Sequence, residues 1–278
     1  MNDKQTMPPL RFGFGSNWRQ FLSTIDEASI QRAVDSLQSF LKINSLEDKR
    51  FLDVGCGSGL FSLAARRMKA DVSSFDYDAL SVQCARKLET SFLPSNDDAW
   101  HIEQGSILDD RYIDKLGQFD VVYAWGVLHH TGSMWQAIEN TKKLTRENGL
   151  LYLAIYNDQG SRSAIWKIIK RLYCSNLLGR SLVSIVTLPY FLFGGMTVGM
   201  IRYKNPFQHF FNYKRNSRGM SFYHDWIDWL GGYPYEVAKP KEIVEKLVSD
   251  NFQLINHKWT NGSGCNEFLF KNQTAETL

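Results

Sequence analysis

The sequence has few cysteines and little net charge, and each shortage excludes a class of protein. Its four cysteines, Cys56, Cys84, Cys174 and Cys265, stand far apart without any C-x-x-C pair, so neither a zinc site nor a disulfide framework is predicted. The 32 basic and 29 acidic residues leave a net charge of only +3, which indicates no nucleic-acid partner. A reducing cytoplasm is therefore the expected compartment.

A secretory signal is also missing, because residues 1–9 are polar and carry no apolar stretch after a basic cluster. What the chain does have is size and aromatic content. With 278 residues, 44% of them hydrophobic, it can bury one large core with an elaborated subdomain. Aromatic residues make up 14% of the chain, which suits a deep pocket as well as a core.

Residues 51–60, with the sequence FLDVGCGSGL, predict a short buried strand, a glycine-rich turn and the start of a helix over 60–69. Gly55, Gly57 and Gly59 allow the backbone to turn sharply and to approach a ligand, because glycine has no Cβ and tolerates positive φ. The first amides of the helix would point at that ligand.

The spacing of this turn excludes two nucleotide-binding motifs. A dinucleotide fingerprint needs a third glycine at position 60, which is leucine, and a P-loop needs a lysine that the segment lacks. Asp53, at the strand end, would repel a pyrophosphate and attract an ammonium group. S-adenosylmethionine has an ammonium, a sulfonium and no phosphate. Residues 51–60 resemble motif I of class I S-adenosylmethionine-dependent methyltransferases, although a tight structural turn remains the alternative for this segment alone.

A second expected strand, over 70–76, ends in an acid 17 positions after Gly59. A carboxylate there can accept hydrogen bonds from both ribose hydroxyls of an adenosine, so Asp76 is the predicted ribose ligand. Tyr77 is expected beside the adenine, and Asp78 is the predicted N-cap of a helix over 79–90. The alternative is that Asp76 only caps the same helix.

Residues 100–109 predict a third strand and its following turn. In the resembled family that turn contacts the adenine edge, which the resemblance assigns here to Ser106 and Ile107. A fourth strand begins at residue 119 and carries Trp125 near its end. The predicted cofactor-binding set is Asp53, Gly55, Cys56, Gly57, Gly59, Asp76, Tyr77, Ser106, Ile107 and Trp125.

The fourth strand runs into Val-Leu-His-His at residues 127–130. The tract 119–132 resembles motif IV of the methyltransferases related to those of ubiquinone and menaquinone biosynthesis. His129 and His130 stand where the methyl group should emerge, and an imidazole titrates near the working pH. One of them is the candidate base. The alternative is that both are hydrogen-bonded structural residues at the start of a helix.

Short apolar strands alternate with helices from residue 51 to residue 157, which predicts a doubly wound, Rossmann-like α/β fold. The resemblance implies a seven-stranded, mostly parallel sheet, closed by an antiparallel pair over 252–259 and 266–270. Residues 12–18 are expected to form an aromatic, glycine-rich loop over the cofactor, or else an ordinary hydrophobic staple. A helix over 25–41 is expected at the sheet edge.

Residues 160–238 have no counterpart in a minimal methyltransferase. They predict a mainly helical lid between the cofactor-binding part, 1–159, and the closing part, 239–278. The predicted acceptor-binding residues are Phe14, Asn17, Trp18, Tyr156, His224, Asp225 and Tyr235. His224, Asp225 and Asp228 offer too few fixed ligands for a metal, so none is expected.

Inside this insertion, the uncharged run 181–201 is long enough to cross a bilayer. Pro189 and the pair Gly194 and Gly195 interrupt it, and the run lies between strands of the sheet. It is expected to form a buried or interfacial helical hairpin that packs on the lid or on a twin subunit. Contact with a membrane surface stays open.

The resulting hypothesis is a methyltransferase that moves a methyl group from S-adenosylmethionine to a small molecule, most plausibly to an oxygen of a hydroxyl or carboxylate, and releases S-adenosylhomocysteine. The alternative is a protein that binds the cofactor without transfer and acts as a partner- or membrane-surface-binding module. Nucleic-acid methylation is disfavoured, because the chain lacks both an N/D-P-P-Y tetrapeptide after the fourth strand and a basic stripe.

Overall fold

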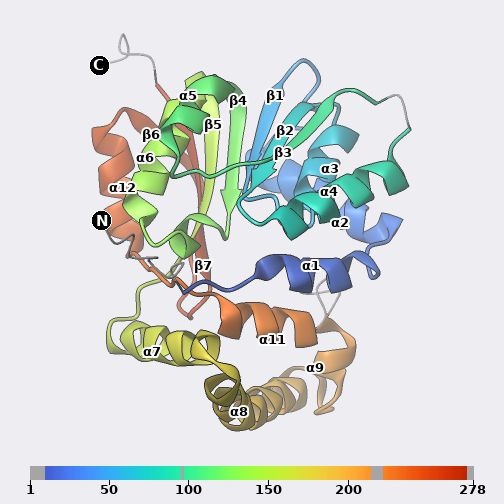
Figure 1. Cartoon of the computed structure of the whole chain (residues 1–278), viewed down its shortest axis with the longest axis vertical. Helices are drawn as coiled ribbons and strands as arrows, with labels where there is room; N and C mark the ends of the chain where they lie inside the picture. Colours follow the sequence, from blue (N-terminus) through green and yellow to red (C-terminus); the bar gives the residue numbers. More distant parts are fainter. Residues whose placement is uncertain (1–9, 95–96, 214–221, 274–278) are drawn as a thin grey trace, which may run out of the picture.

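The computed structural model describes residues 10–94, 97–213 and 222–273. In these residues, seven strands form one sheet in the order β3-β2-β1-β4-β5-β7-β6 (Figure 1). Only β7 runs antiparallel to its neighbours. The strands are β1 (Arg50–Val54), β2 (Asp71–Asp76), β3 (Trp100–Gln104), β4 (Phe119–Trp125), β5 (Thr145–Tyr156), β6 (Phe252–Lys258) and β7 (Cys265–Asn272). The predicted doubly wound sheet with an antiparallel closing pair is confirmed.

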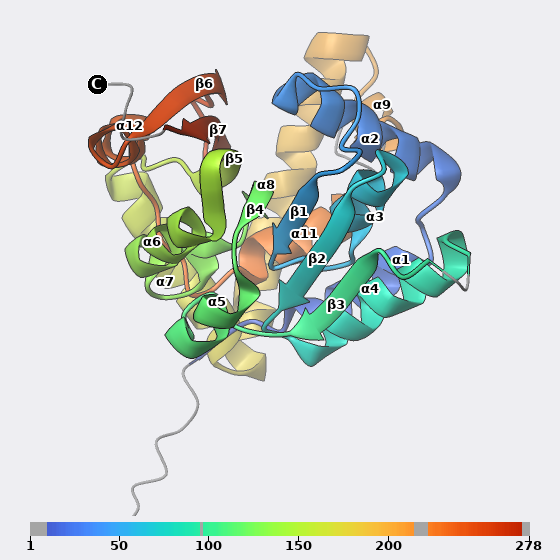
Figure 2. The same ribbon diagram turned by 90° about the horizontal axis from the view of Figure 1, so that it is seen from above.

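Helices cover both faces of the sheet (Figure 2). One face carries α2 (Glu27–Leu41), α3 (Leu60–Arg67) and α4 (Ala79–Phe92), and the other carries α5 (Asp110–Leu116), α6 (Met134–Leu144) and α12 (Pro240–Ser249). Several begin at an aspartate whose side chain accepts a backbone N–H, as at Asp26, Asp78 and Asp109. Such caps satisfy amides that a helix start leaves without an intrahelical partner.

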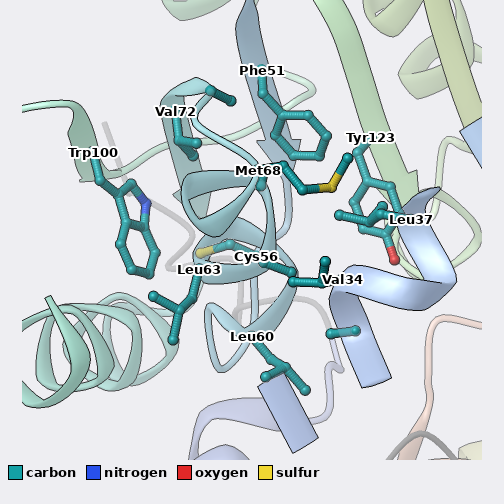
Figure 3. Close-up of a cluster of buried hydrophobic side chains, with 14 of the residues drawn as sticks. Val34, Leu37, Phe51, Cys56, Leu60, Leu63, Met68, Val72, Trp100 and Tyr123 are labelled. Carbon is teal, nitrogen blue, oxygen red and sulfur yellow. The ribbon is translucent and has the colours of Figure 1, made fainter. Parts of the chain in front are cut away.

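Alternate residues of each strand enter two separate cores, because successive side chains of a strand point to opposite faces. Phe51 and Tyr123 belong to the core under α2 and α3, where Figure 3 shows them beside Leu37 and Met68. Their neighbours in the strands, such as Leu52, belong to the second core with α5, α6 and α12. The carboxyl ends of β1, β2 and β4 therefore sit on a platform that is packed from both sides.

The N-terminal segment differs from its prediction. Residues 14–22 form a helix, α1 (Phe14–Leu22), where a loop was expected over 12–18. Its first turn is anchored by the amide of Gly15, which donates to Asp78 Oδ2 over 2.8 Å, and Phe21 packs into the core. The glycines at 13 and 15 suggested a loop, but Gly13 precedes the helix and Gly15 permits close contact with Leu80 of α4.

The position of the next helix, α2, also differs from its prediction. It packs on α3 and on the face of the sheet, and the ring of Phe40 stacks on Tyr152 of β5 at 4.3 Å between ring centroids. The expectation that it covers the sheet edge is wrong. The reason is its long apolar stripe, which includes Ile30, Val34 and Leu37 and is buried along its whole length.

The insertion is helical, as predicted, and consists of α7 (Ser161–Ser175), α8 (Leu177–Tyr203), α9 (Gln208–Phe211) and α11 (Phe222–Gly231) among the described residues. It has its own small core around Tyr173, Val183, Trp226 and Leu230. Figure 1 shows these helices below the carboxyl ends of the strands. Asn157 and Ala238 form a parallel bridge, so the insertion leaves and re-enters the fold at one point.

The apolar run 181–201 forms part of one continuous helix, and the expected hairpin is wrong. Pro189 lies inside α8 without ending it, since an internal proline removes one backbone hydrogen bond and kinks a helix more often than it reverses the chain. A Cβ at Gly195 would contact the ring of Phe210 on α9. The glycine that suggested a turn therefore allows close helix packing.

Candidate active site

A cavity of about 660 Å³ opens at the carboxyl ends of the strands, between the sheet, α1 and the insertion. Its volume lies within the range of about 300–1,000 Å³ that is usual for small-molecule sites. Most of the predicted site residues line it: Phe14, Trp18, Asp53, Gly55, Cys56, Gly57, Asp76, Tyr77, Ser106, Ile107, Trp125, His130 and Tyr156. Segments more than 100 positions apart in the sequence thus meet in one pocket.

The glycine-rich turn forms the floor of the cavity. Gly55 and Gly57 have φ values of 70° and 56°, which side chains with a Cβ rarely adopt. The amide of Gly55 donates to the carbonyl of Phe75 over 2.8 Å, which ties the turn to β2. The indole of Trp18 lies so close that a Cβ at Gly57 would approach it to 2.9 Å. The turn therefore leaves its backbone accessible from the cavity.

Two carboxyl groups flank this turn, Asp53 fully buried and Asp76 half-buried. Asp53 Oδ2 accepts a hydrogen bond of 2.6 Å from Ser62, and burial raises its pKa to about 7. Asp76 accepts from the amides of Gly57 and Asp78 over 3.0 and 2.8 Å, yet burial raises its pKa to about 6. Each carboxyl is costly to ionise without a cation nearby. A ligand with a cationic group would relieve that cost.

The far end of the cavity is formed by the turns after β2 and β3. Tyr77 is 57% exposed, and the guanidinium of Arg11 lies over its ring at 4.3 Å from the centroid. Ile107 is buried, and its carbonyl accepts a hydrogen bond of 2.8 Å from Asn140. Ser106 Oγ accepts from the amide of Leu108 over 3.2 Å. These contacts hold the turn in shape beside the cavity.

The two histidines follow β4 in a short 3₁₀ helix, Leu128–His130, and differ in position. His130 lines the cavity, whereas His129 is fully buried outside its lining. His130 Nδ1 lies 2.8 Å from the carbonyl of Pro234. A carbonyl can only accept, so Nδ1 carries the hydrogen of a neutral ring and Nε2 carries the lone pair. Burial lowers the pKa of His130 to about 3 and that of His129 well below its ordinary value.

The returning end of the insertion is hydrogen-bonded along the histidine segment. The amide of Glu236 donates to the carbonyl of His129 over 3.0 Å, and its carboxylate accepts from the amide of Met134. Near the same point, the amide of Phe12 donates to the carbonyl of Tyr233 over 3.0 Å. The insertion and the N-terminal segment are thus both fixed at the cavity.

Two residues that line the cavity and one buried behind it escaped the sequence prediction. Arg11 donates to the carbonyl of His130 over 3.2 Å, and Trp229 of α11 is part of the lining. Lys170 of α7 is fully buried, donates to the carbonyl of Trp229 and lies 5.7 Å from the ring centroid of Tyr156. For Lys170, the one signal in the sequence was its helical spacing with Ser163 and Tyr173, which form the buried stripe of α7.

Several predicted site residues lie outside the lining. Gly59 begins α3, and a Cβ there would approach Ala85 of α4 to 2.9 Å, so it serves helix packing. Asn17 is buried in α1, and Tyr235 is buried behind Tyr156 with 5.3 Å between their ring centroids. His224 and Asp225 belong to α11, but their side chains are outside the described part of the structure, as is that of Asp228. Within the described residues, no group of three or more His, Cys, Asp and Glu could hold a metal ion.

The arrangement matches a known family. Residues 25–221, more than two thirds of the chain, match the family model described as Methyltransferase domain. The chain belongs to this family. Among curated proteins, the ubiquinone biosynthesis O-methyltransferase of Glaesserella parasuis is 31% identical over 117 residues, which cover 42% of this chain and 49% of that protein. The corresponding enzyme of Bordetella avium is 27% identical over 137 residues, covering 49% and 54%. The methyltransferase spans about half the length of these relatives.

Solved structures agree with the fold of the methyltransferase. The magnesium protoporphyrin IX methyltransferase of Synechocystis PCC 6803, solved with bound SAH, covers 93% of this chain and 94% of its own, with a TM-score of 0.56 at 15% identity. PKMT2 of Rickettsia typhi, in complex with AdoHcy, covers 97% of this chain and 56% of its own, with a TM-score of 0.53 at 14% identity. The family match and the solved structures agree: the chain is a member of the methyltransferase family and has the fold of proteins solved with SAH or AdoHcy.

The cavity of the methyltransferase fits S-adenosyl-L-methionine. Its floor is a backbone cradle, since a Cβ at Gly57 would displace Trp18. Asp53, buried at its side, and Asp76, half-buried beside it, offer negative charge that would suit the ammonium group and acceptors that would suit the ribose hydroxyls.

Proposed function

We propose that this enzyme methylates an oxygen of a small-molecule acceptor, with His130 as the group that takes the proton. The proposal is carried by one observation, the placement of His130 in the cofactor cavity with its Nδ1 bonded to the carbonyl of Pro234. The printed names of the curated relatives, all O-methyltransferases, also favour an oxygen. The match covers only about half of them, so their substrate is not carried over.

Asp53, Gly55, Gly57 and Asp76 are proposed to hold the cofactor, with Tyr77, Ser106 and Ile107 around its adenine and Cys56 and Trp125 along the cavity. When bound, S-adenosylmethionine supplies an electrophilic methyl group on a sulfonium that departs as a neutral thioether. The protein must then hold the acceptor oxygen in line with that methyl group and keep water out. Positioning of this kind accounts for much of the rate in such displacements.

Of the two histidines, His130 is the better candidate base. His129 is fully buried outside the lining, and its Nδ1 accepts the amide of Tyr156 over 3.4 Å, so its proposed role is to position the strand end. Burial holds the pKa of His130 at about 3, so the expectation of an imidazole that titrates near the working pH is wrong for this ring. The ring is neutral at physiological pH, and its Nε2 carries the lone pair. It can accept the proton of a hydroxyl as the oxygen–methyl bond forms.

The acceptor end of the cavity is aromatic. Phe14, Trp125, Tyr156 and Trp229 line it around His130, and the rings of Phe14 and His130 lie 5.2 Å apart between centroids. These surfaces favour an acceptor with a flat or apolar body. The insertion is proposed as the lid over this end, and Trp18 as a wall shared with the cofactor. Asn17, Tyr235, His224 and Asp225 remain proposed only as supporting residues.

A cytoplasmic location is proposed for the enzyme. All four of its cysteines are free, as expected in a reducing compartment. A homodimer remains a further proposal, and we treat contact with a membrane separately below.

The first test is methyl transfer. The protein is incubated with S-adenosylmethionine carrying an isotopically labelled methyl group and with panels of phenols, alcohols and carboxylic acids, and labelled products are detected by mass spectrometry. We expect a labelled ether or ester. His130→Ala should lower turnover by roughly two to four orders of magnitude, with unchanged cofactor affinity.

The matched control for this variant is His101→Ala, whose ring is 71% exposed on β3 and should have no effect. Parental turnover in His130→Ala, with a carboxylic acid as the acceptor, would show that no base is needed. Tight cofactor binding without any labelled product, in the presence of crude metabolite extract, would favour the alternative of a binding module.

A further inference from the structure

The outer surface of the insertion is unusually apolar. Among the described residues, 17 of the 23 exposed large hydrophobic side chains lie between Ile165 and Phe211. We call this surface the outer lid face; it comprises the exposed side chains of α7, α8 and the segment 207–211. Exposed fractions reach 70% at Ile185, 68% at Phe193 and 81% at Ile201. A monomer rarely leaves a continuous apolar patch of this kind in water, and such patches mark interaction surfaces.

Helix α8 has its polarity reversed relative to a helix of a soluble core. Its buried positions are Gly179, Val183, Thr187, Gly195 and Gly199, which are mostly small. The large apolar side chains point away from the protein. An amphipathic helix in water buries its large apolar residues, so the environment that α8 is built for lies on its outer side.

The charge around this face has one sign. From residue 159 to residue 213 the sequence contains no aspartate or glutamate and seven lysines and arginines. Six of these are exposed, and only Lys170 is buried. Lys167 and Arg171 border the exposed apolar stripe of α7 at Ile168, and Arg180 and Arg202 stand near the two ends of α8. Basic side chains at the border of an apolar face are suited to anionic headgroups.

The packing of α8 favours an orientation along a membrane surface over one that spans the bilayer. By length and composition α8 could cross a bilayer. However, α7 packs at its N-terminal end, where a Cβ at Gly179 would contact the carbonyl of Leu172, and Phe210 of α9 packs near its C-terminal end at Gly195. A spanning orientation would pull these partners and their charges into hydrocarbon, which costs several kcal/mol for each unsatisfied group.

We infer that the outer lid face docks on the surface of a bilayer that contains anionic lipid, with α8 parallel to the membrane plane. The exposed apolar side chains would enter the headgroup boundary, and the basic residues would meet lipid phosphates. A second copy of the chain fits less well, because it would bring two acid-free basic surfaces together. The inference does not depend on methyl transfer.

Vesicle binding tests this inference. The full chain is sedimented with vesicles of phosphatidylcholine alone and of phosphatidylcholine mixed with phosphatidylglycerol. We expect binding to the mixed vesicles, weakened by salt. Lys167→Glu with Arg171→Glu should reduce the partition coefficient roughly tenfold or more, and Ile185→Ser with Phe193→Ser and Ile201→Ser should abolish binding.

The substituted side chains are exposed, so folding should be unaffected, and circular dichroism checks this. The matched controls are Lys241→Glu and Val248→Ser, both exposed on α12 away from the outer lid face; they should bind vesicles like the parent. A chain that ignores both vesicle types overturns the inference, and a dimer that the triple variant disrupts would then assign the face to a second copy. Protein that resists alkaline carbonate and needs detergent for release would indicate a spanning helix, and would also overturn it.

Discussion

At the scale of single residues, the two acids Asp53 and Asp76 are expected to decide how the proposed cofactor site responds to pH. Both have raised pKa values, about 7 and about 6, and burial is the main cause in each case. The neutral forms stabilise the fold without cofactor. The ionised forms are those that a cationic ligand needs. Folding and cofactor binding therefore favour opposite protonation states of the same groups.

The first prediction at this scale concerns thermal stability. An aspartate has a pKa near 3.9 in an unfolded chain, so the raised folded values stabilise the protein below about pH 4, and this contribution is lost as the pH rises through 6 to 7. From about pH 5 to 8, the melting temperature without cofactor should fall, and the increase caused by S-adenosylhomocysteine should grow. Differential scanning fluorimetry measures both. In Asp53→Asn the two trends should flatten, and an equal ligand-induced increase at every pH would contradict the assignment.

The second prediction concerns Asp76. Asp76→Asn keeps an acceptor oxygen for only one of the two amides, Gly57 and Asp78, that bond to separate carboxylate oxygens, and it loses the charge proposed to bind the ribose. Affinity for S-adenosylmethionine should fall by about 1.5–3 kcal/mol, the range for hydrogen bonds to charged groups. Calorimetry measures the change, with Asp71→Asn, exposed at the other end of β2, as the control. Equal losses in both variants would remove Asp76 from the site.

Residues of this kind could be predicted because their role is local. Asp53, Gly55 and Asp76 stand at strand ends, and the sheet alone brings strand ends together. Lys170 and Arg11 could not be predicted, since each is placed by packing between segments far apart in the sequence. Lys170 of α7 donates to Trp229 of α11 behind the cavity, and Arg11 donates to His130 at the cavity. The distinction between His129 and His130 likewise depends on Pro234, 104 positions away.

At the scale of elements, α1 is the part of the site whose structure differs most from its prediction. Its sequence favours a loop, because two glycines lower the helix propensity and only two or three aromatic residues form an apolar stripe that would indicate a helix. Tertiary contacts decide otherwise: Asp78 caps the start of α4 through Oδ1 and binds the first turn of α1 through Oδ2. The helix then places Trp18 against Gly57. The cofactor cavity is therefore closed by an element outside the sheet.

This contact gives a prediction for the loop and the helix together. Gly57→Ala should weaken cofactor binding at least tenfold, because its φ of 56° strains an alanine and the new methyl group meets the indole of Trp18. Adding Trp18→Ala should restore part of the loss by removing that contact. Gly13→Ala is the control, since no atom lies within 4 Å of its Cβ position. Titration with S-adenosylhomocysteine measures all four proteins, and a double variant no better than Gly57→Ala would contradict the proposed contact.

At the scale of the whole molecule, the alternation of strands and helices from residue 51 to residue 157 predicts a doubly wound sheet, and the resemblance to class I methyltransferases adds its seven mostly parallel strands. The helical nature of the insertion could also be predicted. The continuous path of α8 could not be predicted. Proline and glycine occur both where a chain reverses in a hairpin and where a continuous helix packs closely on a neighbour, so the local sequence does not separate the two. Which side of α8 faces the protein depends on α7 and α9, and these follow from no pattern within α8 itself.

The strand order of the sheet also determines when each strand can pair during synthesis on the ribosome. The edge strand β6 precedes β7 in the chain but reaches the sheet only through it, since β7 lies between β5 and β6. Until residues 265–272 have left the exit tunnel, β5 presents an unpaired edge and β6 has no strand to pair with. Among the described strands, the one made last is an interior one, so the nascent chain carries an open, aggregation-prone edge at β5 from about residue 156 until β7 emerges.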